Sequence, residues 1–523
     1  MINLSFIDIF IILFYFAAVL YIGFRSARKT TRSEEDYLLA GRSLTLPVFV
    51  MTLVSTWYGG ILGVGEFSYR HGISNWVVQG LPYYVFAAVF AFFLAKKIRA
   101  TNLYSIPDKL AHAYDNKTAL LGSVLTFILM TPAPYILMLS VFLQMLFGWS
   151  MLLSVIVTAI VILPYLYFGG FRSDVQTDVL EFILMFLGFL IIIPFCITSY
   201  GGFEYLQSSL PPLHLAWHGG HSIQYILVWF FIALWTLVDP AFHQRCYAAK
   251  DGTTAQKGIL VSIIFWFIFD CMTATAGLYA RAALPNLQNP IAAYPMLAET
   301  ILPPVAKGLF YVGMLATIMS TLNTLAFVSA QTLGRDVAMR LEVRGLSNTL
   351  TPASPLPNLG EGNKRGEGYS HLEPANSNQS LTKYTQLGLI VSFVFSALLG
   401  LAIPSVIKLW YTIGTVVIPG LLVPLMASYF ERLKISARYA FLSMLLGWLT
   451  SLGWLIAGHV NGATGNYPLG IEPMYPGLAV SLILWGVGRL RECRNLGEGA
   501  FCPNRFLLLL GGVLLSSSFI VML

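Results

Sequence analysis

The chain has 523 residues, of which 57% are hydrophobic and only 11% are charged. Soluble domains carry roughly a quarter charged residues, so this composition excludes a soluble globular protein and indicates a membrane protein. The net charge of +7 gives no reason to invoke nucleic acid, because the basic residues gather between apolar segments, as in membrane proteins.

Apolar segments near 20 residues recur along the chain, and each is long enough to cross a bilayer as a helix. We expect one polytopic, all-α membrane domain over residues 1–523, with about fourteen spans. The predicted spans are 5–24, 45–68, 76–96, 120–147, 151–167, 175–197, 222–240, 257–283, 302–333, 383–403, 405–427, 437–457, 472–488 and 506–523.

The first span is expected to be an anchor and not a cleaved signal peptide, because basic residues follow it and none precedes it. With the N-terminus outside, all Lys and Arg fall in inside loops, such as 245–257, except Arg70, Arg281, Lys307 and Lys408. We therefore predict a multi-pass protein of the plasma (inner) membrane with its N-terminus outside. We expect the protein to contact the lipid bilayer, and the sequence indicates no obligate protein partner.

Glycines 59, 60, 63 and 65 interrupt the second predicted span. Unwound backbone at membrane depth is tolerated where it lines a cavity, and its carbonyls can hold sodium in transporters. The alternative is close helix packing through small residues. The sequence leaves both interpretations open.

Asp178 ends a segment that begins at Gly169-Gly170 and runs into an apolar span. The expected place of Asp178 is just inside the membrane from the cytoplasmic face, where acids are costly and usually functional. A helix N-cap is the alternative, and Asp174 or Thr177 would serve that role equally well.

Two adjacent hydroxyls, Ser320 and Thr321, lie in the middle of a long apolar segment. The Thr317 carbonyl precedes them by three and four residues, so the three groups share one helix face. Such an oxygen-lined spot suits a hard cation such as sodium. The alternative is that each hydroxyl bonds to the carbonyl four residues earlier in its own helix.

The long polar stretch 340–382 is rich in Pro, Gly, Asn and Ser. We expect a disordered cytoplasmic loop, either regulatory or a tolerated insertion.

Four segments, in this order, resemble the sodium:solute symporter family, which includes bacterial proline and sugar symporters and animal glucose and iodide carriers. They are Asp36–Leu44, Leu53–Trp57, Gly169–Asp178, and Met319-Ser320-Thr321 followed by Gly334-Arg335-Asp336. The resemblance implies a leucine-transporter-type fold of 5+5 inverted repeats, roughly 45–197 and 222–427. One helix would precede the repeats and about three would follow them.

The resemblance also implies sodium as the coupling ion. By this resemblance, Asp178 corresponds to a family acid on the inner sodium route. Arg42 corresponds to a family arginine that resembles part of the inner gate. The implied sodium ligands are the carbonyls of Ser55, Tyr58 and Thr317 and the hydroxyls of Ser320 and Thr321.

The solute does not follow from the resemblance. Gly59 to Leu62 replace the polar ligands of the sugar carriers, and Trp57 stands where the proline carriers have an acid. Aromatic residues favour a pocket for a small organic solute, although plain packing or an interfacial belt is the alternative. The candidate pocket residues are Trp57, Tyr58, Gln79, Trp229, Trp235 and Trp410.

Four further ionisable residues lie in or near predicted spans, and each is a functional candidate: Glu66, Asp239, His243 and Asp270. Asp239 and His243 are expected near the inner surface, where water would solvate them. Asp270 is expected deeper, as a functional group or as a structural hydrogen-bond hub.

We therefore predict a sodium-coupled secondary active symporter that imports a small organic solute by alternating access. One alternative is proton coupling through Glu66, Asp178 or Asp270, and another is a solute sensor that lacks transport. An enzyme is not expected, because the predicted spans contain no His-Glu-x-x-His, no Gly-x-Ser-x-Gly and no paired metal ligands.

Overall fold

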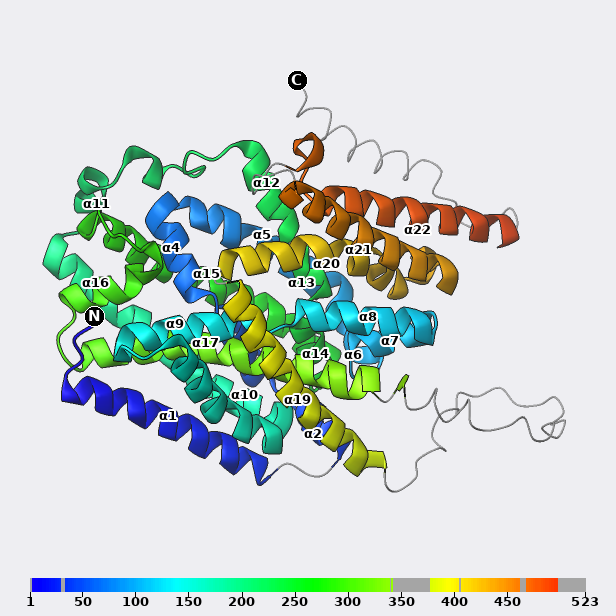
Figure 1. Ribbon diagram of the computed structural model, residues 1–523, viewed down its shortest axis with the longest axis horizontal. Helices are drawn as coiled ribbons and strands as arrows, with labels where there is room; N and C mark the ends of the chain where they lie inside the picture. The colour runs from blue at the N-terminus through cyan, green and yellow to red at the C-terminus, as the bar shows by residue number, and fades with distance from the viewer. Residues whose placement is uncertain are drawn as a thin grey trace.

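The computed structural model describes residues 2–29, 33–338, 340–341, 377–403, 406–460 and 467–496. Within these ranges every long element is a helix, and the only β pairing is an isolated bridge between Leu44 and Ala249. The predicted all-α class is therefore confirmed. Figure 1 shows α1 along one edge of the molecule and α22 on the opposite side. The longer helices are α1 (Phe6–Ala27), α3 (Leu46–Trp57), α4 (Ile61–His71), α5 (Leu81–Phe90), α8 (Asn116–Leu129), α9 (Ala133–Phe147), α10 (Met151–Tyr200), α12 (Ile223–Ile232), α14 (Pro240–Ala248), α15 (Gly252–Ala283), α16 (Ala293–Ile301), α17 (Ala306–Gln331), α19 (Ser377–Ala402), α20 (Val406–Ser428), α21 (Ala437–Val460) and α22 (Met474–Leu496).

Among the described residues, ten helical segments are long and apolar enough to cross a membrane, or eleven if the bent pair α3 and α4 counts as one span. The predicted spans up to 472–488 all coincide with helices, whereas 506–523 lies outside the described residues. Most of the predicted loop 340–382 also lies outside them, and α19 begins at Ser377, before the predicted end of that loop.

The second span is broken between α3 and α4, which bend by 59° across residues 58–60. A Cβ on Gly59 would overlap the Thr321 side chain of α17, and a Cβ on Gly60 would overlap the Trp410 ring of α20. Unwound backbone and close helix packing, the two alternatives for these glycines, therefore occur together at Gly59 and Gly60. The backbone is broken there, and the absence of side chains lets two other helices approach it closely.

The predicted spans 151–167 and 175–197 form one helical element, α10. An unbroken helix of its 50 residues would be about 75 Å long, more than twice the roughly 30 Å of a bilayer core. Gly170 interrupts α10 with φ 55° and ψ −145°. This conformation is open essentially to glycine alone, so Gly170 divides α10 into two segments.

The predicted span 222–240 is also broken, and it extends further than expected. Helix α12 is followed by the short helix α13 (Trp235–Val238) and then by α14. Pro240 is the first residue of α14, and the Asp239 carboxylate accepts hydrogen bonds from the backbone N–H groups of Ala241 (2.7 Å) and Phe242 (3.1 Å). Asp239 thus caps a new helix in the middle of the span.

Helix α17 forms the centre of the fold, as Figure 1 shows. Its apolar window is entirely buried, and its most extensive partner is α10. A Cβ on either Gly188 of α10 or Gly313 of α17 would lie 2.9 Å from the Cα of the other. Small residues let these two backbones pack closely, which is the main source of attraction between helices in lipid.

Substituting Gly170 by Ala is expected to lower the melting temperature of the detergent-purified protein clearly. The Ala Cβ would overlap the Tyr37 carbonyl oxygen, and the φ and ψ of this position cost about 1–3 kcal/mol for a non-glycine residue. Gly202→Ala is the matched control, since a Cβ there meets no atom within 4 Å. Equal melting temperatures for the two variants would contradict a structural requirement for glycine at position 170.

Candidate functional site

A buried polar cluster lies where α3, α10 and α17 meet. The Ser320 hydroxyl of α17 donates a hydrogen bond to Asp178 Oδ1 of α10 over 2.6 Å, and the Thr52 hydroxyl of α3 donates to Asp178 Oδ2. All three side chains are completely buried. The N-cap interpretation of this segment is wrong, because Asp174, Thr177 and Asp178 all lie within α10, which begins at Met151.

Thr321 joins α17 to the broken end of α3. Its hydroxyl donates to the Thr56 carbonyl over 2.6 Å and accepts from the Gly59 N–H over 2.8 Å. The Thr317 hydroxyl bonds within its own helix, because it donates to the Gly313 carbonyl (2.7 Å). That alternative is wrong for Ser320 and Thr321, which bond to other helices.

The same cluster contains a cation that the sequence analysis missed. Arg245 of α14 is completely buried, although we assigned it to the solvated inside loop 245–257. Its Nη2 donates to the hydroxyls of Thr56 (2.8 Å) and Thr324 (2.7 Å) and to Asp178 Oδ2 (3.3 Å). Removing a charged guanidinium from water costs several kcal/mol unless carboxylates compensate it, so Arg245 and Asp178 depend on each other.

Acids outnumber this arginine. Asp174, Asp178 and Glu181 follow one another on one face of α10, and all three are completely buried. Asp174 Oδ2 lies 3.5 Å from Arg245 Nη2, and Glu181 Oε1 accepts from the Tyr15 hydroxyl over 3.1 Å. Within the described part of the chain, one oxygen of Asp174 and one of Glu181 have no hydrogen-bond partner. The i, i+4, i+7 spacing of these acids was the sequence signal for the cluster.

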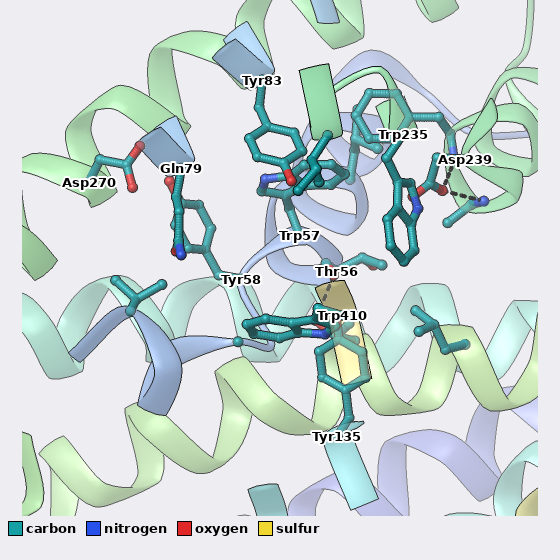
Figure 2. Close-up of a pocket in the computed structure, with 18 of the residues that line it drawn as sticks. Thr56, Trp57, Tyr58, Gln79, Tyr83, Tyr135, Trp235, Asp239, Asp270 and Trp410 are labelled. Atoms are coloured by element: carbon teal, nitrogen blue, oxygen red, sulfur yellow. Dashed lines mark hydrogen bonds between the residues drawn. The ribbon is translucent and has the colours of Figure 1, made fainter. Parts of the chain in front are cut away.

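A cavity of about 150 Å³ lies beside this cluster. Figure 2 shows it between the α3–α4 break, with Thr56, Trp57 and Tyr58, and the second break, with Trp235 and Asp239. Thr56 and Thr321 belong to both the cavity wall and the polar cluster. The six pocket candidates from the sequence all line this one cavity: Trp57, Tyr58, Gln79, Trp229, Trp235 and Trp410.

The aromatic wall is held by ring contacts. Trp57 meets Tyr83 and Phe242 edge-on, with centroid distances of 5.0 and 5.3 Å. Trp410 packs against Tyr135 at 5.9 Å. Figure 2 shows Trp57 and Tyr83 on one side of the space and Trp410 and Tyr135 on the other.

Two carboxylates also line the cavity, Asp239 and Asp270. The expectation that water at the inner surface solvates Asp239 and His243 is wrong, because both are buried. The His243 ring lies 3.1 Å from the Leu237 carbonyl and 3.3 Å from the Tyr429 hydroxyl, so it serves packing among helices. The Asp239-Pro240 pair was the sequence signal for this second break.

Asp270 lies deep in the structure, as expected, and its role stays a prediction. Its carboxylate accepts a hydrogen bond from the Tyr84 hydroxyl, and it faces the cavity. Glu66 does not line the cavity, and it pairs with Arg70 one helical turn later at 3.1 Å.

Arg42, the gate candidate, joins three segments. Its guanidinium donates to the carbonyls of Asn102 (2.9 Å), Leu103 (3.3 Å) and Tyr247 (3.1 Å), and its Nε lies 3.5 Å from Glu35 Oε1. These bonds tie the turn before α3 to the loop after residue 100 and to the end of α14.

A second ionic group connects the Gly334-Arg335-Asp336 motif to distant segments. Arg335 pairs with Glu34 and with Asp108, both at 2.6 Å, and with its neighbour Asp336 at 3.1 Å. Asp336 also accepts from the Ser105 hydroxyl over 2.9 Å. The end of α17 is thereby tied to the segments around residues 34 and 105.

Comparisons with known proteins place these features in a wider context. The chain is 25% identical over 487 residues to the sodium/pantothenate symporter of Escherichia coli, with 88% of this chain and 91% of that protein covered. It is 23% identical over 386 residues to the sodium/glucose cotransporter of Vibrio parahaemolyticus, with 64% and 69% covered.

Among solved structures, a substrate-bound, outward-open Na+-coupled sialic acid symporter aligns with a TM-score of 0.73 at 16% identity, covering 95% of this chain and 99% of that one. The leucine-transporter-type fold is therefore confirmed. The model of the sodium:solute symporter family matches residues 37–350, which is more than half of the chain. The chain is thus a member of the sodium:solute symporter family.

Proposed function

We propose that this chain is a sodium-coupled secondary active symporter that imports a small organic solute by alternating access. It would do so as a multi-pass protein of the plasma (inner) membrane with its N-terminus outside. Family membership and fold support symport in general. The relatives act on different solutes by name, pantothenate and glucose among them, so the family does not identify the solute here.

The observation that carries sodium coupling is the buried cluster around Asp178. Its three carboxylates exceed its one arginine, and a bound cation would reduce that excess charge. The hydroxyls of Ser320 and Thr321 direct their protons to Asp178 and to the Thr56 carbonyl, respectively. Oxygen lone pairs therefore remain on both hydroxyls for a sodium ion, which prefers oxygen ligands.

The backbone can supply the remaining ligands. Helix α3 ends at Trp57, and the last four carbonyls of a helix have no partner within it. The Ser55 and Tyr58 carbonyls lie at this end, and the Thr317 carbonyl lies one turn before the two hydroxyls. Together with Ser320 and Thr321 they form the proposed sodium site.

Coupling would pass through the α3–α4 break. Sodium would bridge α17 to the end of α3, whose next residues, Trp57 and Tyr58, line the cavity. An ion that holds these residues in place favours the state that binds solute. Because coupling is reciprocal, solute must then raise sodium affinity by the same factor.

Release to the inside would involve Asp178, Arg245 and Arg42. Arg245 already contacts Asp178 Oδ2, whereas Ser320 contacts Oδ1, so a departing sodium ion can leave Asp178 paired. Arg42 would act at the inner gate, because its three backbone partners must separate when that side opens.

Ser320→Ala combined with Thr321→Ala is expected to abolish sodium-dependent stabilisation. The melting temperature of the purified wild type should rise when sodium chloride replaces potassium chloride at constant ionic strength, because a ligand of the folded state stabilises it by mass action. Thr317→Ala is the control, since its carbonyl is the proposed ligand and its hydroxyl bonds within α17. A double variant that keeps the full sodium shift would refute the site.

Asp178→Asn is expected to raise the sodium concentration for half-maximal stabilisation by about tenfold or more, which corresponds to roughly 1.4 kcal/mol. The amide keeps the shape but removes the charge closest to Ser320. Glu66→Gln is the control, because Glu66 is an acid outside this cluster and pairs with Arg70. Equal effects of the two variants would show that overall charge, and not the Asp178 position, governs sodium affinity.

Proton coupling is the second candidate, because Asp174 and Glu181 each keep a buried oxygen without a partner and a proton on either would also reduce the excess charge. In proteoliposomes, solute uptake driven by an inward proton gradient without sodium would favour it. A solute that stabilises the protein but never enters proteoliposomes would favour the sensor.

A further inference from the structure

We propose that the solute is a small organic cation that carries an ammonium group, and that the cavity between the two helix breaks recognises this group. The inference rests on the proposed function, in which this cavity holds the solute. It is carried by the charges and the ring surfaces that line the cavity.

The charge of the cavity wall is entirely negative. Asp239 and Asp270 line the cavity, and the described residues of its wall include no Lys, Arg or His. Among the described residues, neither carboxylate takes part in an ion pair. Both residues are buried: Asp239 exposes 7% of its surface and Asp270 exposes 8%. A buried acid without a cation is costly, and a cationic solute would offset that cost.

The hydrogen bonds of the two acids do not replace such a cation. The Asp239 contacts are the backbone N–H groups of Ala241 and Phe242, which carry only the partial positive charge of a helix N-terminus. Asp270 accepts from the neutral Tyr84 hydroxyl. The cation closest along the chain, Arg245, is engaged with the acids of α10.

The walls between the two acids suit an ammonium group. Aromatic rings attract cations through their faces, and cages of such rings recognise quaternary ammonium ligands. Figure 2 shows the rings of Trp57, Tyr83, Trp235 and Trp410 in the space between Asp270 on one side and Asp239 on the other. The rings would take the methyl or methylene groups around the nitrogen, and the acids would supply the opposite charge.

Other solute classes fit these residues less well. An anionic solute would face two acids and no basic side chain. A sugar would find hydrogen-bond partners in the amides Asn75 and Gln79 and in the threonine and tyrosine hydroxyls of the wall, but it would leave the charge of both acids unbalanced. The volume of about 150 Å³ is below the roughly 300–1,000 Å³ of pockets for drug-sized ligands, which limits the solute to a small molecule. An ammonium group also occurs in zwitterions, so the test must separate net cations from zwitterions.

The test measures binding of four probes to the purified full chain in sodium chloride, by thermal shift and calorimetry. Choline is the cation, and 3,3-dimethylbutan-1-ol is its neutral carbon analogue. Glycine betaine is the zwitterion, and pantothenate is the anion. Choline is expected to bind at least about tenfold more tightly than each of the other three. Equal binding of the neutral analogue, or preference for betaine or pantothenate, would overturn the proposal.

Variants locate the effect in the cavity. Asp270→Asn and Asp239→Asn should each weaken choline binding by about tenfold or more and leave binding of the neutral analogue unchanged. Asn is also a good N-cap residue, so the second variant preserves α14. Glu66→Gln is the control, because Glu66 is an acid outside the cavity that pairs with Arg70. Weakened choline binding in the control alone would contradict the assignment.

The sodium titration of the same samples separates the two proposals. If sodium stabilises the protein and none of the four probes binds, the organic-cation proposal fails while sodium coupling stands. If choline binds identically in sodium and potassium chloride, the cavity assignment stands and sodium coupling fails.

Discussion

The Ser320 hydroxyl meets the Asp178 carboxylate in the most buried part of the molecule, where neither group can turn to water. An ionised carboxylate at such depth persists only with several partners. Asp178 finds them on three different helices: Ser320 on α17, Thr52 on α3 and Arg245 on α14. The requirement to satisfy one acid thus orients three helices that are distant in the sequence, and their relative positions define the cavity next to them.

The proposed sodium site and the solute cavity are adjacent because they share a short piece of backbone. The Thr56 carbonyl accepts a hydrogen bond from the Thr321 hydroxyl, the Thr56 hydroxyl accepts one from Arg245, and Thr56 also lines the cavity. The next two residues, Trp57 and Tyr58, belong to the aromatic wall. A small displacement of the backbone at the end of α3 would therefore alter the polar cluster and the cavity together. Coupling in the proposed cycle would then need no long pathway, because one short piece of backbone contacts both proposed sites.

Sequence reasoning predicted the fold well, since apolar length and charge asymmetry are properties of whole segments. The convergence of hydroxyls on α17 could also be predicted, because it follows from helical periodicity. Arg245 could not, because its position near the end of an apolar run resembles a solvated loop charge, and only the three acids of α10 make its burial tolerable. The second helix break was hidden for a similar reason: Asp239 and Pro240 lie next to the expected membrane edge, where such residues are ordinary. The roles of the individual site residues stay predictions, since partners in space and not neighbours in sequence decide them.

The glycines of the first break also limit how substitutions can change the shape of the cavity. Side chains at Gly59 and Gly60 would overlap the Thr321 side chain and the Trp410 ring, so a larger residue at either position requires one of these side chains to move. At the second break the Trp235 ring packs against Gly414 of α20, where an added Cβ would lie 3.2 Å from the ring. Changes of solute preference would therefore come from the side chains that line the cavity, such as Trp229 and Trp235, and not from these glycines. In the proposed cycle the glycines would keep the shape of the helix break, and the aromatic side chains would determine which solute fits.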